Sequence, residues 1–138
     1  MPLRVRFASS SRVGPEFNQQ QLEQILQNLQ IRGATVDRSE NAVRWLNLRG
    51  AGAEYIAEQG RPGILLLRPG ATRLEVVEEL IHHGQAVRTR FQIPTDVSAE
   101  IFQATREIQA QENLLNIARR LNWTEEEIDA ITRARVYW

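Results

Sequence analysis

The chain has 138 residues, of which 42% are hydrophobic and 25% are charged. That length and polarity suit one globular domain, residues 1–138, with its own hydrophobic core. Seventeen basic residues balance seventeen acidic ones, so no overall field attracts nucleic acid or a membrane surface, and we expect neither as a partner. The chain contains no cysteine, so any metal ion must be held by histidine and carboxylate side chains. Every basic residue is arginine, which excludes lysine Schiff-base chemistry.

No apolar run approaches the roughly 20 residues that cross a bilayer. The N-terminal segment alternates apolar residues with arginine and builds no signal-type apolar stretch. We therefore expect a soluble protein that is cytoplasmic unless a larger system exports it. The sequence itself leaves the compartment and the oligomeric state open.

A strand and a helix are predicted first along the chain. Residues 3–7 alternate apolar and charged side chains, which indicates a half-buried strand. Apolar residues recur at helical spacing over residues 17–29, and Gly33 follows where a left-handed helix cap is favoured.

The next segment allows two interpretations. Residues 34–37 and 42–48 have strand-like content. Ser39 is also a suitable N-cap, in which case a short helix would run through Trp45.

A β-hairpin is predicted in the middle of the chain. Residues 54–57 and 64–67 are strand-like and flank a turn cluster at residues 59–63. Together with the helices, this hairpin indicates an α+β domain with a few-stranded, mostly antiparallel sheet and three to four helices.

A helix from Thr72 to Gly84 carries the residues that suggest chemistry. Thr72 and Glu75 have the spacing of a capping box, which fixes where the helix starts. At about 100° per residue, one arc of this helix is apolar, comprising Leu74, Val76, Val77, Leu80 and Ile81. On the flank beside that arc, Glu78 and His82 lie one turn apart and can converge on one point.

A second long helix, over residues 97–121, is expected to pack against the first. Its predicted apolar arc, Ile101, Ala104, Ile108, Leu114, Leu115, Ala118 and Leu121, also contains Glu100, Glu107 and Gln111. A carboxylate that faces a core is costly unless it is paired, protonated or bound to metal. Glu107 therefore requires a partner, which is His82, a shared metal ion, or one of the arginines at positions 68, 73, 88, 90 and 106.

The C-terminal segment is interpreted as structural. Thr124 and Glu127 form a further capping box, and Trp123 and Ile128 have the spacing of a hydrophobic staple.

The run Glu78-Glu79-Leu80-Ile81-His82 resembles the zincin metal motif, with Glu78 in the position of the first histidine. Residues 69–85 are similar to zincin-like metallopeptidase domains at the ends of bacterial polymorphic toxins. Residues 106–111 are similar to the second helix of gluzincin-type domains, in which a glutamate completes the metal triad.

This resemblance implies a zinc ion held by Glu78, His82 and Glu107, with Glu79 as the general base. It further implies a toxin effector domain that cleaves a peptide or protein substrate and is met by an immunity or partner protein. A carboxylate ligand in place of histidine lowers the Lewis acidity of the zinc ion, so the ion activates its bound water less. Gln85 either orients a ligand by hydrogen bonding or caps the end of the helix.

Two hypotheses of different class follow from these residues. The first is a zinc-dependent hydrolase of the metallopeptidase type. The alternative is a catalytically inactive zincin relative, or a partner-binding module, whose Glu78, His82 and Glu107 form a buried polar network. A purely structural interpretation also stands, in which Glu78 and Glu79 are solvated and His82 edges the core.

Overall fold

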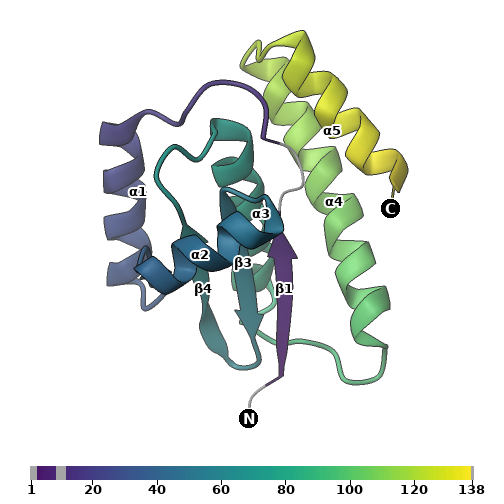
Figure 1. Ribbon diagram of the computed structural model, residues 1–138. Coiled ribbons are helices and arrows are strands. Elements are labelled where there is room, and N and C mark those ends of the chain that lie inside the picture. The colour runs from purple at the N-terminus through teal and green to yellow at the C-terminus, as the bar shows by residue number, and fades with distance from the viewer. Residues whose placement is uncertain (1–2, 9–11, 138) are drawn as a thin grey trace.

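A computed structural model describes residues 3–8 and 12–137 of the chain. Within these residues, a four-stranded sheet has helices on both faces (Figure 1). Its strands, in the spatial order β1-β3-β4-β2, are β1 (Arg4–Ala8), β3 (Ala53–Glu58), β4 (Arg61–Leu67) and β2 (Thr35–Asp37). β3 pairs antiparallel with both β1 and β4, whereas β2 pairs parallel with β4. The α+β class and the mostly antiparallel sheet are therefore confirmed.

The described residues form five helices, which is more than the three to four expected. They are α1 (Gln19–Ile31), α2 (Glu40–Arg49), α3 (Arg73–Arg88), α4 (Ala99–Arg120) and α5 (Glu125–Tyr137). No described helix is long and apolar enough to span a membrane.

The additional helix is α2, so the strand predicted at residues 42–48 is wrong and the alternative interpretation holds. The Ser39 hydroxyl accepts a hydrogen bond from the backbone N–H of Ala42, and Gly50 ends the helix in a left-handed conformation. Ala42 and Leu46 are buried one turn apart. The two caps and this helical spacing outweigh the local strand-like content.

The two faces of the sheet are covered by different helices, because successive side chains of a strand point to opposite faces. Ile56 of β3 packs with Ala42 and Leu46 of α2. On the other face, Ala53 packs with residues of α1 and α3. Figure 1 shows α3 behind the sheet, with α1 to one side of it and α4 to the other. The predicted packing of α3 against α4 is confirmed, with Leu74 of α3 in the same apolar cluster as Leu114 and Leu115 of α4.

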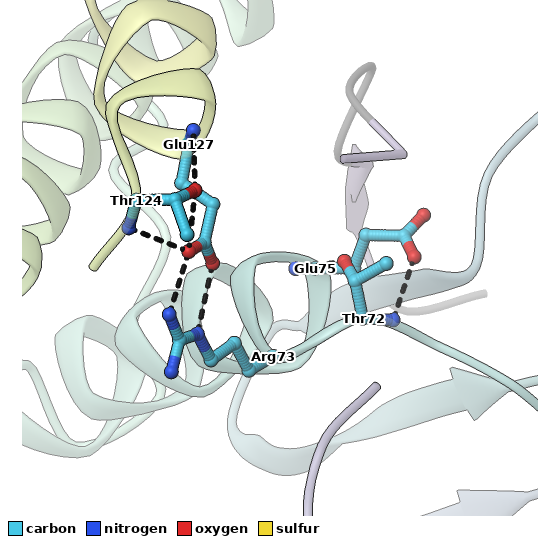
Figure 2. Close-up of polar contacts among 5 residues, drawn as sticks. All are labelled: Thr72, Arg73, Glu75, Thr124 and Glu127. Atoms are coloured by element: carbon cyan, nitrogen blue, oxygen red, sulfur yellow. Dashed lines mark hydrogen bonds and ion pairs between the residues drawn. The ribbon is translucent and has the colours of Figure 1, made fainter. Parts of the chain in front are cut away.

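Two capping boxes position the starts of α3 and α5 relative to each other (Figure 2). Thr72 caps α3, and the Glu75 carboxylate accepts hydrogen bonds from the backbone N–H groups of Thr72, at 2.9 Å, and Gly52, at 2.6 Å. Thr124 and Glu127 exchange the equivalent bonds at the start of α5. Arg73 then donates to both carboxylate oxygens of Glu127, at 2.9 and 2.6 Å, which ties α5 to α3. The start of α3 is therefore fixed as predicted, although the helix continues through Gly84 to Arg88.

Candidate functional site

Helix α3 buries its polar side. Glu78, Glu79, His82 and Gln85 are between 0 and 4% exposed, whereas the apolar residues Val77, Leu80 and Ile81 are only partly buried. Leu74 and Val76 of the predicted apolar arc are buried, and Val77, Leu80 and Ile81 pack against the same core clusters while staying partly exposed. A helix that turns carboxylates inward is informative, since these groups are rarely buried without a specific partner.

Helix α4 supplies the opposite wall of the site. Glu107 and Gln111 are 3 and 2% exposed, as their predicted inward position requires. Glu100, which had been assigned to the same arc, is exposed. Three predicted core residues of this helix, Ile101, Ile108 and Leu121, are exposed as well. The buried stripe instead runs through Phe102, Glu107, Ala110, Gln111, Leu114, Leu115 and Ala118. It includes the two polar residues Glu107 and Gln111 as predicted, and it differs from the predicted arc mainly in its apolar members.

His82 lies at the centre of the contacts between the two helices. Its Nε2 contacts the Oε1 of Glu107, and its Nδ1 lies 2.9 Å from the Oε1 of Gln85. The Gln85 amide nitrogen donates to the backbone carbonyl of Arg106 at 3.0 Å, which leaves the amide oxygen to face the imidazole. His82 Nδ1 therefore donates its proton to Gln85, and Nε2 is directed at Glu107. Of the two roles expected for Gln85, the structure fits orientation of the candidate ligand His82 by hydrogen bonding. Gln85 does not cap the end of the helix.

Glu78 and Glu79 complete the cluster from α3. The Oε1 of Glu78 accepts a hydrogen bond from the Gln111 amide at 2.8 Å. The Oε2 of Glu79 accepts one from the backbone N–H of Tyr55 in β3 at 2.7 Å. Burial raises the pKa of Glu79 well above its ordinary value, and the neighbouring carboxylates of Glu78 and Glu107 raise it further. The neutral acid form of Glu79 is favoured in these surroundings.

The site is closed on the side of the sheet edge. Phe7 of β1 stacks on the His82 ring, with the ring centroids 4.0 Å apart and the planes inclined by 15°. Beside His82 a small cavity of about 10 Å³, also lined by Phe7, Phe102 and Arg106, remains. A space of that size holds about one water molecule.

The hydrogen-bonding capacity of this cluster is incompletely used. Among the described residues, four buried side-chain atoms have no hydrogen-bond partner, and all four belong to this site: Glu79 Oε1, His82 Nε2, Glu107 Oε1 and Gln111 Oε1. The contact between His82 and Glu107 has the separation of an ion pair without the geometry of a hydrogen bond. Buried polar atoms without partners are rare in folded proteins, so their concentration in one place requires an explanation.

The other buried glutamates have arginine partners. Glu54, Glu58, Glu75 and Glu127 each lie within 4.0 Å of at least one arginine nitrogen. Within the described part of the chain, no arginine forms an ion pair with Glu79 or Glu107, and the carboxylate of Glu107 contacts His82 instead. The arginine partner that the sequence allowed for Glu107 is therefore not found there.

The structure thus brings the four predicted site residues together, while their roles stay predictions. The structural interpretation with solvated Glu78 and Glu79 is wrong, since both side chains are buried. In the described residues, no three histidine, aspartate or glutamate side chains are arranged so that they could hold a metal ion as they lie. Sequence reasoning missed the contributions of Phe7 and Tyr55, because nothing in a strand indicates which helix residue it will contact.

Comparison with protein-family models, with curated proteins and with solved structures finds no match to this chain. The chemistry of the cluster is therefore the basis on which a function is inferred.

Proposed function

We propose that Glu78, His82 and Glu107 bind a zinc ion and that the protein is a zinc-dependent hydrolase of the metallopeptidase type. The observation that supports this most is the set of four buried polar atoms without hydrogen-bond partners, all of which belong to residues of α3 and α4. An unbound cation is one of the few physical reasons for such a set.

The charges and donor types of the cluster favour the same proposal. The buried carboxylates of Glu79 and Glu107, which form no ion pair with a described arginine, need protons or a cation to offset their charge. Carboxylate oxygen and imidazole nitrogen are donors that suit zinc. Binding requires the direct contact between His82 Nε2 and Glu107 to open, since these atoms are now each other's neighbours.

In this proposal the chain's own residues have distinct tasks. Gln85 keeps the proton of His82 on Nδ1, so that Nε2 can act as a ligand. Glu79, adjacent to the ligand Glu78, would take a proton from the attacking water once the positive charge of bound zinc favours its ionised form over the neutral acid. Zinc, when bound, would polarise the substrate carbonyl and make that water more acidic. Because residues 69–85 resemble polymorphic-toxin domains, we propose that the chain is an effector domain that acts on a peptide or protein.

A second candidate is a catalytically silent partner-binding module with a metal-free polar network. Two observations favour it. Glu79 is 0% exposed, and the cavity beside His82 has room for about one water molecule. A substrate therefore reaches this site only if Phe7 or its neighbours move.

Metal analysis of the purified protein separates the two candidates. Zinc binding predicts stoichiometric zinc in the wild-type chain and its loss in His82→Ala, which removes a ligand. His83→Ala is the matched control, because His83 is the adjacent histidine, contacts Tyr55 and lies outside the cluster. Wild-type protein that is folded and takes up no added zinc contradicts the first candidate and supports the second.

Catalysis is tested by Glu79→Gln. This variant should retain zinc and lose hydrolysis of a mixed library of quenched fluorescent peptides, since it keeps the shape of the side chain and removes the base. If Glu79→Gln cleaves the library as fast as the zinc-loaded wild type, Glu79 is not the base.

A further inference from the structure

A partly exposed apolar stripe runs along α3 on the side away from its buried polar residues, and Val77, Leu80 and Ile81 of this stripe also touch the core clusters. Each of Val77, Leu80, Ile81, Gly84 and Val87 lies three or four residues from another of the five, so they share one face of the helix. Val87 is 48% exposed, and Val77, Leu80 and Ile81 are partly exposed. This face is the counterpart of the buried polar side of the same helix.

Two grooves flank this stripe. One of about 700 Å³ lies between α3 and α4, and one of about 530 Å³ lies between α1 and α3. Both are lined by Leu80, Gly84 and Arg88, so α3 forms a ridge with a hollow on each side. The positions of α1 and α4 on either side of α3 can be followed in Figure 1.

Gly84 lies in the interior of α3, at the centre of this ridge. Glycine in a helix interior costs about 1 kcal/mol relative to alanine. A Cβ atom at this position would meet no other atom within 4 Å, so internal packing does not require glycine here. Gly84 also has no positive φ that would call for it. The missing side chain leaves the helix backbone open to close approach from outside.

The charge around the grooves has one sign. Among the described residues that line them, none is acidic, and Arg32, Arg88 and Arg120 contribute guanidinium groups. All three are exposed, and none forms an ion pair with a described acidic residue. In a chain with no net charge, this concentration selects for an acidic partner.

We propose that this face of α3 docks an amphipathic helix of another protein, whose apolar side lies over Leu80 and Gly84 and whose carboxylates meet Arg32, Arg88 and Arg120. The two hollows accept side chains on either side of the α3 ridge, and Gly84 lets the partner helix come close. The inference does not rest on metal binding or on catalysis.

The test measures binding of designed helical peptides to the full chain by fluorescence anisotropy. One peptide has a leucine face flanked by glutamate, a second replaces glutamate with lysine, and a third is a scramble of the first. We expect the acidic amphipathic peptide to bind most tightly, and its affinity to fall as salt is raised. Equal binding of the acidic and basic peptides overturns the proposal.

Two variants locate the binding on α3. Gly84→Leu fills the open ridge and Arg88→Glu reverses a charge, and each should lower the affinity for the acidic peptide by about tenfold or more. Gly84→Leu should fold at least as stably as wild type, because leucine is the better helix former and its Cβ would meet no packed atom within 4 Å. Arg44→Glu on α2 is the matched control, since α2 covers the opposite face of the sheet, and it should bind as wild type does.

Two further outcomes count against the proposal. Unchanged affinity in Gly84→Leu would show that the peptide binds elsewhere. Concentration-dependent dimerisation in sedimentation experiments that Gly84→Leu abolishes would identify the occupant as a second copy of this chain.

Discussion

Glu127 and Glu79 are both 0% exposed, and their carboxylates meet opposite surroundings. Burial raises the pKa of Glu127, but the hydrogen bonds from Arg73 and Thr124 outweigh it and hold that pKa below its ordinary value. Glu79 receives one backbone N–H and lies beside other carboxylates, and its pKa is raised. The surroundings of Glu127 favour its charged form, and those of Glu79 favour its neutral form.

Glu127→Gln should lower the free energy of unfolding by about 2 kcal/mol, because it removes the charge from two hydrogen bonds that Arg73 makes to a buried carboxylate. Urea unfolding monitored by circular dichroism measures the change. The metal content should not change, since Glu127 lies outside the α3–α4 cluster. A variant as stable as wild type at neutral pH would mean that the pair contributes nothing.

The pH dependence of that difference follows from the lowered pKa of Glu127. Its contribution is fully present above the ordinary glutamate pKa of 4.5 and is lost as the pH falls through the lower value of the folded state. The gap in stability between wild type and Glu127→Gln should therefore be largest near neutral pH and should narrow as the pH falls from 4.5 through the lowered pKa of the folded state. A gap that stays constant into strong acid would contradict this account.

For single residues, the sequence predicts where a side chain lies better than it predicts which group that side chain contacts. Helical spacing placed Glu107 toward the core, and the cost of a buried carboxylate required a partner for it. Of the three partners allowed, His82 is the one that forms the contact. The stacking of Phe7 and the backbone donor of Tyr55 come from strands far away in sequence, which helical periodicity does not describe.

Helix starts are local events, and the capping residues predicted them. Thr72 and Thr124 were each identified as caps, because the side chain that caps a helix lies within four residues of its partner. The end of α3 was predicted too early, at Gly84. The helix continues past this glycine, and Gln85 in the next turn bridges His82 and α4. In α4, Glu107 and Gln111 face inward as predicted, whereas Ile101, Ile108 and Leu121 of the predicted arc are exposed.

The junction of α4 and α5 depends on Trp123. Its ring is 6% exposed, packs with Leu114, Leu115 and Ile131, and lies under the Arg73 guanidinium at 4.9 Å. Trp123→Ala should lower the free energy of unfolding by about 3 kcal/mol through lost packing. Thr124→Ala should cost about 1 kcal/mol through the lost cap.

Chemical denaturation gives both values, and zinc content and peptide hydrolysis, where present, should be as in wild type under native conditions. Leu48→Ala is the control, because Leu48 is 85% exposed and its removal should leave stability nearly unchanged. Loss of zinc in folded Trp123→Ala would contradict the separation of structural from functional residues.

At the scale of the molecule, the candidate site joins parts of the chain that local patterns cannot connect. β1 supplies Phe7, β3 supplies the Tyr55 backbone, and α3 and α4 supply the carboxylates and the imidazole. The hairpin of β3 with β4 was predicted because it is local. The order β1-β3-β4-β2 and the parallel pairing of β2 depend on contacts between strands far apart in the sequence. No short-range pattern in the sequence indicates such contacts.

Because the proposed zinc ligands come from both α3 and α4, zinc should stabilise the whole domain. An ion that binds only the folded chain adds about 2.7 kcal/mol to its stability at about 100 times its Kd, so zinc should raise the melting temperature and EDTA should reverse the rise. His82→Ala should not respond, whereas His83→Ala should respond as wild type does. Hydrogen exchange should slow in both helices and in the Tyr55 amide, which bonds to Glu79. If zinc does not change the melting temperature of the wild type, the buried network binds no zinc and the zinc-dependent hydrolase proposal is wrong.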